Sequence, residues 1–166
     1  MMVYIYIVSL TIANLLVAWL GPWFSPVNAF FLIGLDLLLR DKLHERWGNN
    51  HLAIRMFGMI ATAGAISYIV NQDAGIIAIA SAVSFMAAMI VDSIIYHKLR
   101  HLPWWKKSNG SNIGASAVDS VVFPTIAFGS LMPQIVLLQF VCKVAGGFVW
   151  SLIIDSLSRN TNNPKG

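Results

Sequence analysis

Long apolar runs divide this chain into six segments, and the gaps between them alternate in charge. Nine of the eleven Lys and Arg residues fall in alternate gaps or after the last run, and Arg55 flanks one of these gaps, whereas gaps 21–26, 71–75 and 130–134 contain none. Such segregation is typical of a multi-pass membrane protein whose basic loops stay in the cytoplasm. Backbone groups in lipid must be satisfied internally, so these runs predict helices. The runs are residues 3–20, 27–39, 52–70, 75–96, 115–132 and 135–157.

The charge pattern therefore predicts an all-α membrane protein with six transmembrane helices and with both termini in the cytoplasm. Composition agrees, because 57% of the 166 residues are hydrophobic and 11% are charged, against about 25% charged in a soluble domain. We interpret residues 1–166 as a single integral membrane domain. The basic residues then serve as topology anchors close to membrane lipid, and we expect no nucleic-acid partner.

The second run is interrupted by Asp36 and followed by Arg40. We expect its helix to continue through Arg46 and to end at the turn-forming residues 48–50. Asp36 has two interpretations. It either pairs with Arg40, which lies one helical turn on, or contributes to a buried site.

Asp119 and Lys143 lie well inside the last two apolar runs. A charged side chain at that depth costs a few kcal/mol, so each should face protein or water and have a partner. Two interpretations remain open, and they are compatible with each other. The residues form an ion pair that holds two helices together, or they bind a polar solute.

Polar and small residues surround Asp119 in the sequence. Gly110 and Gly114 permit either a close approach of another element or a break in the helix, and a broken helix at membrane depth has to line a cavity. Asn112 and Asp119 together can hydrogen-bond the edge of a planar heterocycle. Phe123 either stacks on such a ring or packs between helices. Further polar residues of this stretch are Asn109, Ser111, Ser116 and Ser120.

Other polar residues within the runs are less specific. Asp92 lies near the end of its run, where a local ion pair is the favoured interpretation. Gln139, Asn14 and Asn28 suit hydrogen bonds between helices, and Gln139 is also a candidate ligand for the solute.

Catalytic and metal motifs fail on inspection of the sequence. His44 and His51 are too widely spaced for a helical two-histidine zinc motif. His97 and His101 have the right spacing but no evident third ligand. The sequence also has no nucleophile–base grouping, phosphate loop or dinucleotide fingerprint. We therefore expect no enzymatic activity, no cofactor and no metal.

One stretch resembles the signature of a transporter family. Residues 111–123, followed by Ile126-Ala127-Phe128, look like the signature segment of the VUT family of queuosine precursor transporters. Three shorter stretches are similar too. They are Asp36 to Arg40 leading to Trp47-Gly48, Asp92 leading to Lys98 and Trp104-Trp105, and Cys142-Lys143-Val144. Together these cover the chain from Asp36 to its end.

The resemblance implies six helices and uptake of 7-cyano-7-deazaguanine or a related 7-deazapurine across the bacterial inner membrane. It places Asn112, Asp119 and Lys143 on the substrate path, with Asp36 and Asp92 as further candidates. The chain is also similar to the membrane subunits of vitamin transporters, which need partner proteins. That similarity adds a homo-oligomer or an energising partner subunit to the partners expected, beside lipid and a small purine-like substrate.

Both lines of reasoning predict a hydrated pocket for a flat polar solute between the helices. The residues predicted to bind it are Asn112, Asp119, Lys143, Asp36, Asp92, Phe123 and Gln139. The alternative is a small structural or assembly protein of the membrane whose buried charges only hold helices together.

Overall fold

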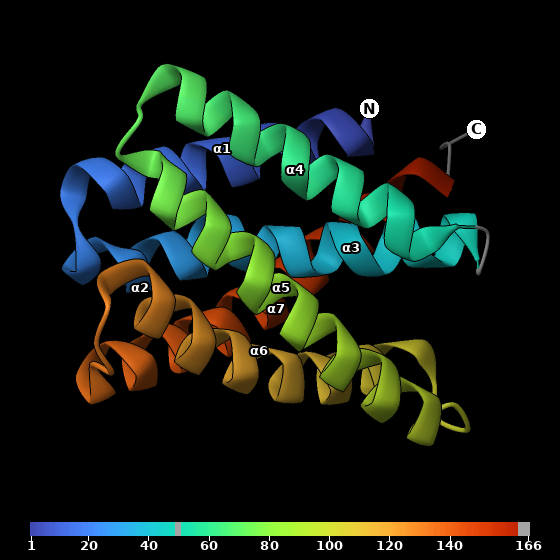
Figure 1. Ribbon diagram of the computed structural model, residues 1–166. Coiled ribbons are helices and arrows are strands. Elements are labelled where there is room, and N and C mark those ends of the chain that lie inside the picture. Colours follow the sequence, from blue (N-terminus) through green and yellow to red (C-terminus); the bar gives the residue numbers. More distant parts are fainter. Residues whose placement is uncertain (49–50, 163–166) are drawn as a thin grey trace.

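A computed structural model shows the chain as a bundle of helices (Figure 1). It describes residues 1–48 and 51–162. Within this range, the side chains that it leaves undescribed are those at positions 37, 41, 44, 45, 52, 53, 104, 105, 108 and 154–162. The predictions for His44 and Trp104-Trp105 therefore lie outside the described side chains.

The described residues form six helical rods, and the second of these is composite. The elements α2, η2 and α3 follow one another without a gap, and η2 is a wider π-helical segment. The elements are α1 (Met2–Leu20), η1 (Pro22–Phe24), α2 (Ser25–Asn28), η2 (Ala29–Ile33), α3 (Gly34–Trp47), α4 (Leu52–Val70), α5 (Ala74–Lys98), α6 (Trp104–Phe128) and α7 (Pro133–Asn162).

Four helices among the described residues are long and apolar enough to cross a membrane. They are Met2–Leu20, Pro22–Arg40, Ala74–Lys98 and Pro133–Ile153, and large apolar side chains such as Ile69, Ile79 and Leu137 are exposed on the outside of the bundle. The apolar part of α4, Ile54–Val70, is shorter, and α6 carries the polar stretch around Asp119. The predicted all-helical architecture is thus confirmed, and membrane-spanning capacity is confirmed for four of the six helices.

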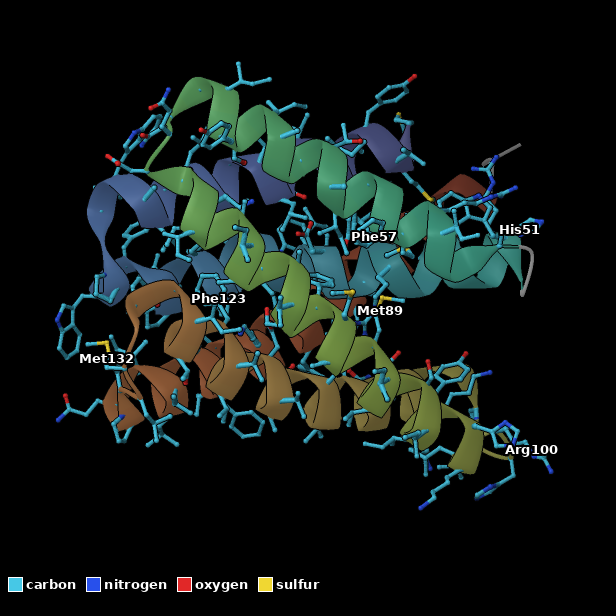
Figure 2. All side chains as sticks on the ribbon, in the orientation of Figure 1. His51, Phe57, Met89, Arg100, Phe123 and Met132 are labelled. Atoms are coloured by element: carbon cyan, nitrogen blue, oxygen red, sulfur yellow. The ribbon has the colours of Figure 1, made fainter. Side chains whose placement is uncertain are left out.

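Basic residues gather at one end of the bundle, which we call the basic end. Figure 1 shows that α1 begins, α7 ends, and the α3–α4 and α5–α6 connections lie at this same end. Figure 2 places Arg100 and His51 there and Met132 at the opposite end. The side chain of Arg159 and all of Lys165 lie outside the described residues. The common end for the basic loops agrees with the predicted topology, whereas the side of the membrane on which the termini lie stays a prediction.

The irregular backbone is the π-helical segment η2 of the composite helix. It does not lie in α6, where Gly110 and Gly114 allowed a break. Helix α6 is continuous through Gly110 and Gly114, so the predicted alternative of a break in this helix is wrong. These glycines instead allow α5 to pack closely: a Cβ on Gly110 would lie 2.7 Å from a methyl carbon of Leu99, and Gly114 faces Ile95. Helix α3 continues to Trp47, which confirms the predicted continuation through Arg46.

An apolar core occupies one side of the bundle, between α1, α3, α4 and α5. Tyr6 and Phe85 meet edge to face in it, with ring centroids 6.3 Å apart. Buried polar side chains occur on the core helices too, such as Asp36 on α3 and Ser67 on α4, and a further group lies on α2, α6 and α7. The core residues are Tyr6, Leu10, Leu39, Leu43, Met56, Met59, Ile60, Ala63 and Phe85.

Two glycines bring the composite helix and α7 into backbone contact. A Cβ on Gly34 would lie 2.8 Å from the carbonyl carbon of Gly146, and a Cβ on Gly146 would collide with the carbonyl oxygen of Phe30 in η2. Small residues at such crossings let membrane helices pack without interlocking side chains. This crossing fixes the height of α7 against η2, and so positions the polar residues of α7.

We predict that Gly146→Ala lowers the melting temperature of the purified protein. The added methyl group meets backbone atoms that cannot rotate away, and overpacking of this kind costs about 1–3 kcal/mol. Gly147→Ala is the matched control, because a Cβ there has no heavy atom within 4 Å. An equal loss of melting temperature in the two variants would contradict the close crossing.

Candidate functional site

A buried ion pair joins the last two helices. The Nζ atom of Lys143 on α7 lies 2.7 Å from Oδ2 of Asp119 on α6, and the two residues are 2% and 8% exposed. Lys143 also donates to Oε1 of Gln139 at 3.1 Å and to Oγ of Ser120 at 3.3 Å. The predicted partnership of Asp119 and Lys143 is thus confirmed as a contact.

Gln139 extends this network to the start of the composite helix. Its Nε2 atom donates to Oγ of Ser25 at 2.7 Å, and the Ser25 hydroxyl donates in turn to the carbonyl oxygen of Pro22 at 2.6 Å. Gln139 lies four residues before Lys143, so both side chains project from one face of α7. A continuous chain of hydrogen bonds therefore links α6, α7 and α2.

The network borders a small cavity inside the bundle. Its volume is about 20 Å³, which is enough for about one water molecule. Several of the predicted residues thus line one cavity, but in this conformation it has no room for a nucleobase, so a pocket for such a solute stays a prediction. The cavity is lined by Asn14, Ser25, Asn28, Ser81, Ser84, Asp119, Gln139 and Lys143, and by the apolar residues Ala13, Ala29, Ile33, Phe85 and Phe123.

Two asparagines on the cavity wall hold neighbouring helices. Asn14 accepts a hydrogen bond from Ser81 at 2.7 Å, which confirms its predicted role as a link between helices. Asn28 donates to the carbonyl oxygen of Ala13 at 3.0 Å. Its Oδ1 atom is buried and has no hydrogen-bond partner among the described residues. A solute N–H group in the cavity could satisfy this oxygen.

Phe123 supplies an aromatic face beside the ion pair. It lies one helical turn beyond Asp119 on α6 and lines the cavity, and Figure 2 shows its position on this helix. Its ring meets Phe128 edge to face, with centroids 6.1 Å apart. Phe123 therefore both packs against a neighbouring aromatic ring and faces the cavity, so the structure is compatible with each of the two predicted interpretations.

Two other predicted site residues belong to a separate polar group around Arg40. An Arg40 nitrogen lies 3.4 Å from Oδ1 of Asp92 on α5 and donates to Oδ1 of Asn112 on α6 at 3.1 Å. Arg40, Asp92 and Asn112 are all less than one-tenth exposed. We call these three residues the Arg40 cluster. Asn112 is thus held by an arginine rather than beside Asp119.

Asp36 stands apart from both groups. It is fully buried, and Oγ of Ser9 on α1 donates to its Oδ1 atom. Its other oxygen, Oδ2, has no hydrogen-bond partner among the described residues. The structure shows Arg40 paired with Asp92 on α5 and bonded to Asn112 on α6. It does not show the predicted pair of Arg40 with Asp36.

The structure thus divides the predicted site residues. It brings Asp119, Lys143, Gln139 and Phe123 to one cavity and places Asp92 and Asn112 in the Arg40 cluster. The sequence analysis missed three polar cavity residues, Ser25, Ser81 and Ser84. The three-residue spacing of Ser81 and Ser84 places both on one face of α5. This spacing is the feature of the sequence that could have identified them as cavity residues. Serines are common in membrane helices as packing residues, so the signal is weak.

Metal-ligating side chains do not cluster in the part of the chain that the structure describes. No group of three or more His, Cys, Asp or Glu residues is positioned there to hold an ion. His97 and His101 are exposed at the basic end. The chemistry available at the cavity is therefore hydrogen bonding and ion pairing by Asp119, Lys143 and Gln139.

A comparison with protein families identifies the class of this chain. The family model described as "Putative vitamin uptake transporter" matches residues 1–154. No curated protein and no solved structure matches the chain. The match covers the first five helical rods and most of the sixth, including both partners of the Asp119–Lys143 ion pair. The chain therefore belongs to the VUT family of membrane transporters.

Proposed function

We propose that this protein takes up a queuosine precursor, 7-cyano-7-deazaguanine or a related 7-deazapurine, across the bacterial inner membrane. Membership of a transporter family and the resemblance of residues 111–123 to queuosine precursor transporters support the proposal. The observation that carries it is the Asp119–Lys143 ion pair on the wall of a polar cavity. Buried charge of this kind in a membrane helix is a mark of a solute path.

The side chains at the cavity complement a neutral bicyclic heterocycle. The Asp119 carboxylate and the Asn28 Oδ1 atom can accept from ring or amino N–H groups, while the Lys143 ammonium can donate to a ring carbonyl or nitrogen. The Gln139 amide both donates and accepts, and Phe123 can cover a ring face. Because Asp119 and Lys143 neutralise each other, a neutral solute adds no uncompensated charge to the site.

Binding requires the cavity to widen. Sites for small molecules usually enclose at least about 300 Å³, whereas this cavity has about 20 Å³. In the bound state we expect α7 to move away from α6, so that the solute lies between Asp119 and Lys143. The conformation described here then corresponds to the empty, closed transporter.

A structural role for the charges is the competing function. Lys143 has three side-chain partners, and the cavity beside it is the size of one water molecule. These facts alone would suit an ion pair that only holds α6 against α7. The two functions differ in their response to a ligand and to rearrangement of the charges.

We expect Asp119→Ala to abolish uptake of 7-cyano-7-deazaguanine while the protein still reaches the membrane. The substitution removes the carboxylate that accepts from the heterocycle. The measurement is accumulation of labelled substrate by cells that express each variant at matched membrane levels. Asp73→Ala is the control, because Asp73 is an exposed acid outside the membrane helices and its loss should leave uptake unchanged. Full uptake by Asp119→Ala would refute the assignment.

Exchanging the two charges separates transport from helix pairing. The double variant Asp119→Lys/Lys143→Asp keeps an ion pair between α6 and α7 but reverses the positions of donor and acceptor. We expect it to melt within a few degrees of the unsubstituted protein, because the pair still forms, and to transport nothing. If the double variant retains both stability and uptake, the charges serve only to hold the helices.

A 7-deazaguanine should also stabilise the purified protein against heat. A ligand that binds only the folded form adds about 2.7 kcal/mol at one hundred times its dissociation constant. We expect a rise in melting temperature with 7-cyano-7-deazaguanine, a smaller rise with guanine, and none with cytosine. No shift with any 7-deazapurine would contradict the proposed substrate class.

A further inference from the structure

The Arg40 cluster lies between the cavity and the basic end. Asn112 precedes Asp119 by seven residues on α6, so it is about 10 Å nearer the basic end along that helix. Its partners Arg40 and Asp92 lie on α3 and α5, in the last two turns before those helices reach the same end. One guanidinium group therefore ties α3 to the consecutive helices α5 and α6, on the basic-end side of the Asp119–Lys143 pair.

A buried polar residue lies between the two groups. Ser116 follows Asn112 by one helical turn on α6 and is 1% exposed, and its hydroxyl has no hydrogen-bond partner among the described residues. With Asn112, Asp119 and Ser120 it gives α6 a polar stripe directed into the bundle rather than toward lipid. An unsatisfied hydroxyl in this position suits a surface that water or a solute reaches in another conformation.

A second acid is within reach of Arg40. Asp36 precedes it by one turn on the same helix, the spacing at which an acid and a base can pair. Asp36 is fully buried, and its Oδ2 atom has no hydrogen-bond partner among the described residues.

We propose that Arg40 is the gating residue of the transport path and exchanges its partner between Asp92 and Asp36. This inference rests on the proposed transport function. With Arg40 on Asp92 and Asn112, α3 is tied to α5 and α6 and the basic end is closed. With Arg40 on Asp36, the ties to α5 and α6 are released, and the path along Ser116 to the Asp119–Lys143 pair opens.

Exchange of partners avoids leaving the buried charge of Arg40 unpaired when the gate opens, whereas simple separation of Arg40 from Asp92 would not. Leaving one partner of a buried ion pair alone costs about 3–5 kcal/mol, which would make a gate that merely breaks the pair open too rarely. An arginine that moves to another buried acid keeps its charge compensated in both states. Asp36 also gains a partner for the oxygen that lacks one in the closed state.

The test measures how easily water-borne reagents reach the polar stripe. Cys142 is the only cysteine of the chain, so a Cys142→Ser background with Ser116→Cys carries a single thiol beside the gate. The full-length protein in lipid nanodiscs is treated with a positively charged methanethiosulfonate reagent, and the labelling rate is recorded without any substrate. The rate reports the fraction of time for which the basic end is open.

Neutralising the two acids should have opposite effects. Asp92→Asn weakens the closed state and leaves Asp36 available as an acid partner, so labelling should rise about tenfold. Asp36→Asn removes the alternative partner of Arg40. The labelling rate of the thiol at position 116 should therefore fall below the rate measured with Asp36 and Asp92 both intact. Asp73→Asn makes the same charge change at an exposed position and should leave the rate unaltered. Each variant is first shown to be folded by its melting transition.

The outcomes also separate the gate from the proposed substrate. If both Asn variants change labelling in the same direction, or neither differs from Asp73→Asn, Arg40 is not an exchanging gate. Opposite shifts in labelling, together with no binding of any 7-deazapurine, support the gate and reject the proposed substrate. Binding of 7-cyano-7-deazaguanine without opposite shifts rejects the gate and keeps the substrate.

Discussion

Charges buried inside a membrane-embedded bundle must be compensated, and this requirement organises the protein. Asp119 meets Lys143 across α6 and α7, and Arg40 meets Asp92 across α3 and α5. The first pair joins two helices that contribute no residue to the apolar core, whereas the second joins two helices that do, since that core lies between α1, α3, α4 and α5. The contact of α6 with α7 therefore depends more on directional polar contacts, and the core side of the bundle depends more on non-directional apolar packing. The Asp119–Lys143 contact, which can break and re-form, therefore lies at the cavity.

Much of this arrangement follows from the sequence because the signals are local. Hydropathy gives the helical rods, and the distribution of Lys and Arg gives the common end of the basic loops. Lys143 is the only Lys or Arg deep inside an apolar run, and Asp119 lies well inside the neighbouring run, so their pairing could be inferred without coordinates. The match of residues 1–154 to the VUT family confirms the resemblance found in residues 111–123.

Tertiary contacts account for what the sequence did not predict. Asn112 lies seven residues from Asp119, yet Arg40 holds it in a different group, because the long Arg40 side chain reaches it from α3. The same approach of α5 and α6 gives Arg40 partners other than its helical neighbour Asp36. Gly110 and Gly114 could signify either a break or a close crossing, and only the position of α5 decides between them. Ser25, Ser81 and Ser84 become cavity residues through helix packing, which their immediate sequence neighbours do not determine.

The π-helical segment Ala29–Ile33 has a consequence for how this family can vary. A π turn amounts to one extra residue within an α-helix, so losing one residue there would restore regular winding and rotate everything before it by about 100°. Hydropathy, net charge and the number of rods would hardly change. Ser25 and Asn28 would nevertheless turn away from Gln139 and the cavity. A relative that lacks one residue at this point would therefore have the hydropathy, net charge and number of rods of this transporter. Different side chains would nevertheless line its cavity.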